Sequence, residues 1–324
     1  MGRRRLGAIA AMALLSGLIP WQAAHAATMW VWPGPAPCDT TLQACLDNAS
    51  SGDEVLIDES GAIQEQAKIE DKSLTLRTEA GVTAELDSLV VKTLNATSPV
   101  TVLVAHVDVA NTLFVDIEGA SGATVTLDHV SAVSSGGDPG IFGRIFHAST
   151  INVLHSQVTQ EGFYPGIELF SPSANNEALT WNVEGNAVNG KLATMTQAGI
   201  ALQAVNASSL HANVDNNSVW DVGQGVTQGQ YGGMVLFAQG SGDADFNLVG
   251  NTIDKIHGAG VNVENNELSP NTFGVDLFNN IIANTSGPAV DLVNDSGTGP
   301  MVFRGGHNDL YGNKQPNQLG GASI

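Results

Sequence analysis

The sequence is poor in basic residues, in cysteine and in aromatic side chains. Only 12 of its 324 residues are Lys or Arg, against 32 Asp or Glu, and the formal net charge is -20. Nucleic-acid binding needs clustered cations that displace counterions from phosphates, so no nucleic-acid partner is expected. The acidity is explained either by solubility or by affinity for divalent cations, and the composition leaves both explanations open.

Long apolar runs are missing beyond the N-terminus. Residues 6–19 are apolar, follow Arg3, Arg4 and Arg5, and precede the small-x-small sequence Ala24-His25-Ala26. This pattern predicts a signal peptide over residues 1–26, and the apolar run is too short to span a bilayer. We therefore expect an exported protein, periplasmic or extracellular, without a membrane span. Cleavage would leave nine basic against 32 acidic residues, a net charge of 9 minus 32, or -23.

Cys38 and Cys45 are the only two cysteines. Export to an oxidising compartment favours a disulfide. If both lay on one helix, their Cα atoms would be about 10 Å apart, beyond the roughly 7 Å limit for a bridge. A capping box at Thr40-x-x-Gln43 would place Cys38 before the helix, where the chain can fold back. The bonded and unbonded states therefore both remain open, and no metal site is expected here, because no His lies nearby.

One pattern recurs through the C-terminal half: a polar slot, usually Asn, followed two residues later by a branched aliphatic residue. The slots are Asn186, Asn217, Asn251, Asn280 and Asn308, with weaker copies at Asp128 and Ser156, in steps of 28 to 34 residues. A second series of strands starts at Gly166, Gly199, Gly233, Gly260 and Ala289. Such periods, combined with short alternating strands, predict a β-solenoid.

The Asn slots have a structural explanation. Asn tolerates the left-handed backbone of a tight corner, and stacked coils place equivalent amides about 4.8 Å apart. We therefore expect a buried ladder of hydrogen-bonded Asn side chains, with the following aliphatic residues stacked inside the coil.

These slots, together with the stretch Thr41–Asp58, in which an amphipathic helix and a Gly-Asp turn precede a strand, resemble right-handed parallel β-helix proteins of the pectate-lyase-like superfamily. The resemblance implies an all-β right-handed parallel β-helix with a short N-terminal capping helix. We expect one domain over residues 27–324, with the cap at about residues 38–53 and the most regular coils at about residues 124–312. Many unrelated activities occur on this fold, so the resemblance does not fix the function.

Functional residues are expected where the chain departs from the repeat. The segments after the slots are long at residues 134–146, 159–165, 189–198 and 220–232, and short at 254–259 and 283–288. Insertions in a solenoid gather on one face, where these would form one wall of a groove. Aromatic faces stack on sugar rings, so we predict a polysaccharide groove that uses Phe142, Tyr164, Trp220 and Tyr231. Alternatively, these aromatic side chains have only a structural role and pack their loops against the solenoid.

Catalysis has weaker support. The resemblance implies a lyase with acidic calcium ligands and an Arg or Lys base, or a hydrolase with paired carboxylates. The outward rows, however, read Glu168, Ala201, Val235, Asn262 and Asp291, then Phe170, Gln203, Phe237, Glu264 and Val293. Neither row pairs acids, and the Asn-Thr-Asp, Asp-Asp, Gly-His-Gly and Arg-Ile-Lys motifs of the related polygalacturonases are missing. A loop-borne site would use Arg144, Lys191, Lys255 or His257 as base and Asp138, Glu161 or Asp221 as partner.

His106, His129 and His155 are interpreted as turn or surface residues, because no second His or acid recurs at a fixed offset from them. No metal site is therefore expected.

Two hypotheses follow. The first is a secreted, monomeric β-helix protein that binds a polysaccharide or cell-surface glycan without chemistry and without a cofactor. The alternative is a polysaccharide lyase or related carbohydrate-active enzyme with a Lys, Arg or His base, in which case Ca²⁺ is a possible cofactor.

Overall fold

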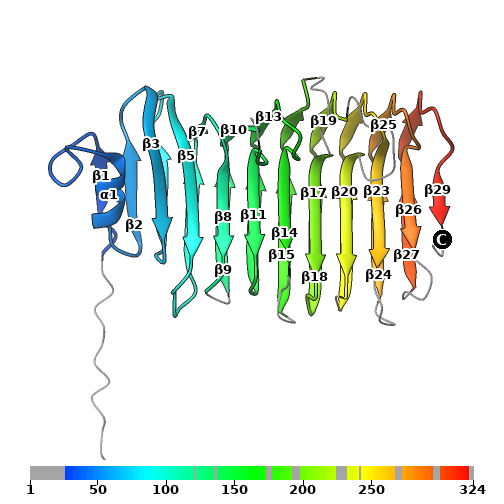
Figure 1. Ribbon diagram of the computed structural model, residues 1–324, viewed down its shortest axis with the longest axis horizontal. Coiled ribbons are helices and arrows are strands. Elements are labelled where there is room, and N and C mark those ends of the chain that lie inside the picture. Colours follow the sequence, from blue (N-terminus) through cyan, green and yellow to red (C-terminus); the bar gives the residue numbers. More distant parts are fainter. Residues whose placement is uncertain are drawn as a thin grey trace, which may run out of the picture.

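The molecule is an elongated stack of coils with one short helix at its N-terminal end (Figure 1). The computed structural model describes residues 26–119, 122–134, 137–172, 177–191, 198–223, 232–240, 242–266, 272–294 and 300–320. The predicted signal peptide lies, apart from Ala26, outside these residues. Strands make up 60% of the chain and helix 3%, which confirms the all-β parallel β-helix with a short capping helix. None of the described helices is long and apolar enough to cross a membrane.

Each coil contributes strands to three parallel stacks. The first stack contains β1 (Met29–Trp32), β2 (Asp53–Ile57), β4 (Leu74–Thr78), β6 (Thr101–Ala105), β9 (Ala123–Asp128), β12 (Ser149–Leu154), β15 (Ala178–Glu184), β18 (Ser209–Asp215), β21 (Asp243–Val249), β24 (Phe273–Phe278) and β27 (Met301–Gly306).

The second stack consists of short strands: β7 (Asp108–Val109), β10 (Ser131–Ser134), β13 (Gln157–Gln160), β16 (Ala187–Asn189), β19 (Ser218–Trp220), β22 (Thr252–Asp254), β25 (Ile281–Ala283) and β28 (Asp309–Tyr311). The third contains β8 (Leu113–Ile117), β11 (Ile141–Ile145), β14 (Ile167–Ser171), β17 (Ala198–Val205), β20 (Gly232–Gln239), β23 (Ala259–Asn266), β26 (Val290–Asn294) and β29 (Gln318–Gly320). In the first coils, the long strands β3 (Gly61–Glu70) and β5 (Ala84–Thr93) serve both stacks, since β5 pairs with β7 and with β8.

Alternation of side chains along each strand builds the core. In β9 the residues at alternate positions, Ala123, Val125 and Leu127, are buried, while those between them are partly exposed. The parallel register then lays Val125 on Ile151 of the next coil, so that aliphatic side chains stack along the axis. The core is one continuous apolar column because every coil repeats this pattern.

The N-terminal end is closed by α1 (Leu42–Asn48), which buries Leu42, Cys45 and Leu46. Its N-cap is Thr41, whose Oγ1 accepts a hydrogen bond from the N–H of Ala44 at 3.0 Å. The predicted capping box started one residue too early, at Thr40. Because Thr41 has the extended backbone of an N-cap, its hydroxyl can reach the first turn.

Cys38 and Cys45 form a disulfide. The chain before α1 turns back on itself, since the N–H of Gly34 donates to the carbonyl of Cys38 and the N–H of Cys38 donates to that of Pro35. This turn brings the two Cα atoms to 4.5 Å, within bridging distance.

The Asn slots form a buried ladder. The backbone N–H and the side-chain amide of Asn217 both donate to Oδ1 of Asn251, at 2.9 and 3.0 Å, and Asn251 donates in the same way to Asn280. Asn186 and Asn308 extend the ladder in the two directions. The amides of Asn186, Asn217, Asn251 and Asn280 are buried and hydrogen-bonded, and that of Asn308 is partly buried, so the ladder fixes the register between coils.

Two details of the expected ladder are wrong. The left-handed backbone belongs to the residue before each slot, with φ of 68° at Gly185 and 55° at Asn216, while the ladder Asn residues stay outside that region. Asp128 is not a slot: the strand register places Val158 beside Ala132, which makes Val130 the equivalent of Ser156. The coil is 26 rather than 28 residues long there, and Val130 has no amide that would reveal its position.

A second row of amides follows the outer face of the first stack. Asn182 donates to Asn152 at 2.7 Å, Asn213 to Asn182 at 2.9 Å, and Asn247 to Asn213 at 3.4 Å. These side chains are partly exposed, unlike the buried ladder, so water can replace their hydrogen bonds.

Candidate functional site

The outer face of the third stack carries two parallel rows of side chains. The strand register aligns Val90, Phe114, Phe142, Glu168 and Ala201 in one row, and Lys92, Asp116, Arg144, Phe170 and Gln203 in the other. Farther along, the same registers confirm the predicted outward rows through Val235, Asn262 and Asp291 and through Phe237, Glu264 and Val293. The first coils therefore place two aromatic rings, Phe114 and Phe142, on neighbouring strands beside three charged side chains, whereas Phe237 has Gln203 and Glu264 as its neighbours in the later coils.

Phe114 and Phe142 form an aromatic platform in the first row. Their ring centroids are 5.2 Å apart and the rings are inclined by 21°, a stacked arrangement across neighbouring strands. Both rings line an open groove of about 460 Å³ at the corner between the second and third stacks. The other lining residues are mostly polar: Gln66, Asp87, Ser88, Val90, Asn111, Thr112 and Asp138. We refer to this site as the aromatic groove.

The polar rim of the aromatic groove is held in place by hydrogen bonds. The side-chain amide of Asn111 donates to the carbonyl and to Oδ1 of Asp87, at 3.1 and 3.0 Å. The carbonyl of Asp138 accepts from the hydroxyl of Ser134 at 2.9 Å, while its carboxylate side is exposed. A stacked apolar floor with amide and carboxylate groups around it has the composition of a site for sugar rings.

A buried carboxylate organises the charges beside the groove. Asp116, only 1% exposed, accepts two hydrogen bonds from Arg144, at 3.1 and 2.8 Å, and lies 3.2 Å from Nζ of Lys92. Arg144 also contacts Glu118 at 2.7 Å. The hydrogen bond that Arg144 donates to Asp116 raises the pKa of Arg144, so its guanidinium stays charged. Arg144, predicted as a possible base, is therefore unsuited to accept a proton.

The same guanidinium supports the aromatic platform. Its carbon lies 5.6 Å from the ring centroids of both Phe114 and Phe146. Such cation–π contacts are attractive. Arg144 thus contacts one ring of the platform, Phe114, and one ring beside it, Phe146, while it pairs with Asp116.

Glu168 continues the row beyond Phe142. Burial raises its pKa to about 7, and the Gln203 amide lies 3.5 Å from its Oε1. A carboxyl group that is part-protonated near neutral pH is a candidate for acid–base chemistry, although structural burial has the same effect.

We expect this buried carboxyl to make stability depend on pH. Between the ordinary pKa of 4.5 and the folded value of about 7, the folded protein retains a proton that the unfolded chain releases. Stability should therefore fall as pH rises through this range, by at most about 3 kcal/mol. Glu168→Gln should lack this loss. Urea unfolding of both proteins at about pH 5 and about pH 8 measures it, and equal pH dependence in the two proteins would contradict the burial argument.

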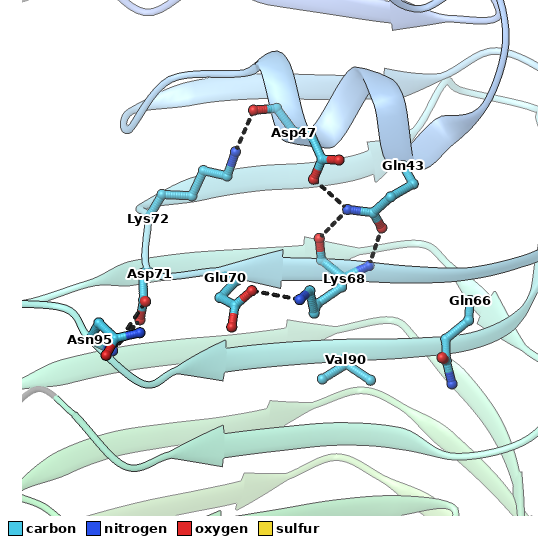
Figure 2. A pocket seen from close by; sticks show the side chains of 9 residues that line it. All are labelled: Gln43, Asp47, Gln66, Lys68, Glu70, Asp71, Lys72, Val90 and Asn95. Carbon is cyan, nitrogen blue, oxygen red and sulfur yellow. Dashed lines mark hydrogen bonds and ion pairs between the residues drawn. The ribbon is translucent and has the colours of Figure 1, made fainter.

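A larger groove, of about 760 Å³, lies beside α1 (Figure 2). Its polar groups are engaged in closing the end of the coil. Nζ of Lys72 donates to the carbonyls of Leu46 and Ala49 at the end of α1, at 2.6 and 2.9 Å. Gln43 pairs with both backbone groups of Lys68, at 2.7 and 3.1 Å. These contacts join α1 to the first coil, so we interpret this groove as a structural feature of the N-terminal cap.

The predicted long segments share one corner, since the strands before and after them are stacked on one another. The corner holds two further groups of candidates. Lys191 pairs with Glu161 at 2.7 Å, on two exposed side chains. Asp221, Lys255 and His257 line a small groove of about 250 Å³ on the coils that follow Lys191, since the N–H of Gly190 donates to the carbonyl of Trp220 and the N–H of Asp221 to that of Asp254. The candidates therefore lie along one corner over successive coils, with Arg144 and Asp138 at the aromatic groove and the others beyond it.

The aromatic candidates are also dispersed. Tyr164 is exposed in the turn after β13 and meets Phe163 edge to face at 5.7 Å. Trp220 ends β19 and is partly exposed. Tyr231 lies outside the described residues. Of the three predicted aromatic residues that the structure describes, Phe142 is the one that lines the aromatic groove.

Phe142 and Arg144 lie in strand β11. The prediction that residues 134–146 form a loop is therefore wrong for these two residues. Gly143 occupies the inward position between them, where a Cβ would come within 2.7 Å of Leu169. Because the inward residue Gly143 has no apolar side chain, the sequence of β11 does not show the alternation of apolar and polar residues that identifies a strand. The partners that were missed, Phe114 and Asp116, occupy the same outward rows one coil earlier, so correct alignment of that coil would have identified them.

Comparison with known proteins adds little to this description. No protein-family model matches the chain, and no curated protein matches it. The matching solved structures include a crystal structure of pectate lyase Pel9A, with 11% sequence identity and a TM-score of 0.44, over 94% of this chain and 82% of that one. The parallel β-helix assignment for this chain thus depends on its own strand pairing.

Proposed function

We propose that the protein binds a neutral polysaccharide through the aromatic groove. The observation that supports this most directly is the stacked Phe114–Phe142 platform within an open, polar-rimmed groove. A pyranose ring has an apolar face that stacks on an aromatic ring and hydroxyls that bind amides and carboxylates. Two successive rings along the coil axis fit a chain of sugars better than a single small molecule.

The charges favour a neutral ligand over an anionic one. The groove is lined by the carboxylates of Asp87 and Asp138, and the chain carries a net charge of -20. The neighbouring cations, Lys92 and Arg144, are already paired with Asp116. A polyuronate would therefore meet repulsion without compensating positive charge.

We expect Phe142→Ala to weaken binding of a short neutral oligosaccharide about tenfold, because roughly 1 to 2 kcal/mol of ring stacking is lost. Titration calorimetry with the best ligand from a glycan array measures the change. Phe237→Ala is the matched control, since Phe237 also faces outward from the third stack but lies three coils farther along. Equal weakening by both substitutions, or by neither, would count against the aromatic groove.

An enzymatic function is the alternative, favoured by one observation: Glu168, with a pKa raised to about 7 by burial, lies one strand beyond Phe142. A lyase would use this carboxyl as acid or base, with Ca²⁺ neutralising the uronate. Incubation with uronic-acid polymers, with and without calcium, tests for unsaturated products by ultraviolet absorbance. Products that disappear in Glu168→Gln would replace the binding proposal by the lyase, and no product with any polymer would exclude it.

We also propose that the protein is exported. The signal-like N-terminus supports this, and the Cys38–Cys45 disulfide fits an oxidising compartment. N-terminal sequencing of the mature protein should begin at Ala27, and recovery of the unprocessed chain from the cytoplasm would refute export.

A further inference from the structure

Three histidines are stacked outside the corner where the first stack turns into the second. His106, His129 and His155 all have left-handed backbones, with φ of 57°, 52° and 49°. Their ring centroids are 4.9 and 5.0 Å apart, close to the spacing between strands. The equal backbone conformation on successive coils places the imidazoles in one line.

A carboxylate joins two of these rings. Asp128, at the end of β9, accepts hydrogen bonds on Oδ1 from Nδ1 of His129 at 2.8 Å and from Nδ1 of His155 at 3.0 Å. One carboxylate oxygen and two imidazole nitrogens thus converge within 4.8 Å of one another.

We propose that Asp128, His129 and His155 form a binding site for a divalent transition-metal ion of the Zn²⁺ type. Two imidazoles and one carboxylate are a donor set that zinc accepts, with water completing the coordination. The side chains of both histidines are 50% exposed, so an ion can reach them from solvent and keep its water ligands. This site is independent of the aromatic groove.

Left-handed corners alone explain part of this arrangement, because His, like Asn, tolerates that backbone. The corner uses Gly185, Asn216, Gly250 and Asn279 in later coils, with the same positive φ. What this preference does not explain is the convergence on Asp128. The ring of His155 also leans over Gly185, where a Cβ would come within 2.8 Å of its Cδ2, so the next coil leaves room for the ring.

The charge of the molecule favours a cation at this site. With 32 acidic and 12 basic residues, the chain attracts divalent ions at low ionic strength. Selectivity for transition metals over calcium would come from the imidazoles, since Ca²⁺ prefers all-oxygen ligands. The sequence shows no fixed spacing for this group, because the histidines are 23 and 26 residues apart and this step changes with coil length.

Calorimetric titration of Zn²⁺ into the full chain, without an affinity tag, tests the proposal. We expect one saturable site, weakened at least about tenfold in each of Asp128→Asn, His129→Asn and His155→Asn. Asn is chosen because it tolerates the left-handed backbone of His129 and His155 and has nearly the same shape as Asp128. His307→Asn is the matched control: His307 is exposed at the same corner, with φ of 57°, and lies far along the coil from Asp128.

A second readout identifies the ligands directly. Zinc should shift the NMR signals of two of the eight histidine rings, and the shifted signals should be those missing from His129→Asn and His155→Asn. Calcium should leave them unchanged. The proposal is overturned if the unaltered protein has no saturable zinc site, or if the three variants bind zinc as tightly as His307→Asn.

Discussion

Trp181→Ala should lower the free energy of unfolding by about 3 to 5 kcal/mol, the cost of a large cavity in a packed core. Trp181 is fully buried in β15. The register places Ile151 on one side of it and Ala212 on the other, followed by Phe246. The small Ala212 provides the space that the indole fills, and stacked coils cannot collapse around a lost ring because neighbouring strands hold them apart.

Urea denaturation measures this loss. Trp220→Ala is the matched control, since Trp220 is partly exposed at the end of β19 and should lose at most about 1.5 kcal/mol. Trp181→Phe should be milder than Trp181→Ala, because it keeps most of the volume and removes an indole N–H that has no hydrogen-bond partner among the described atoms. Similar stability of Trp181→Ala and Trp220→Ala would refute the packing argument.

Asn251→Ala should cost at least about 2 kcal/mol, because it breaks the buried ladder in the middle. The side-chain amide of Asn251 donates to the carbonyl of Val214 at 2.6 Å, and its Oδ1 accepts from the backbone and the amide of Asn217. Truncation leaves these groups buried without partners, each costing about 1 to 3 kcal/mol unless water enters.

Asn247→Ala is the control for Asn251→Ala, because Asn247 lies in β21 only four residues before Asn251. Asn247 belongs to the partly exposed outer row and has one long hydrogen bond, of 3.4 Å, to Asn213. Its loss should cost less than about 1 kcal/mol, because water replaces the bond. Thermal or urea unfolding of both variants decides the point. Equal effects would mean that the buried amides contribute no more than surface ones.

The sequence predicts the solenoid well because each coil repeats a local rule. Val188, Val219 and Ile253 follow their Asn slots at a fixed distance, and parallel pairing places them beside one another. The rule fails where the slot loses its amide, as at Val130. There the coil length was misjudged by two residues, and the neighbouring positions were misaligned with it.

The candidate site was harder to predict because it depends on contacts between coils. Phe142 is predicted from the sequence as a ligand-binding residue, but its neighbour Phe114 is found only in the correct strand register. Asp116 resembles any surface acid in the sequence, yet it is buried under Arg144. His129 and His155 likewise share Asp128 because the parallel pairing of β9 and β12 places the corners of two successive coils side by side.

The pairing of Gln43 with Lys68 has a consequence for assembly. An open β-helix end presents unsatisfied strand edges, to which another copy could add as a further coil. At β3 the Gln43 amide occupies the N–H and the carbonyl of Lys68, and α1 lies across the strand. A head-to-tail fibre would need this edge free in every subunit, because each junction joins one copy's last coil to the next copy's first. We therefore expect α1 and the Gln43 pairing together to oppose such growth, and Gln43→Ala would free the two backbone groups of Lys68.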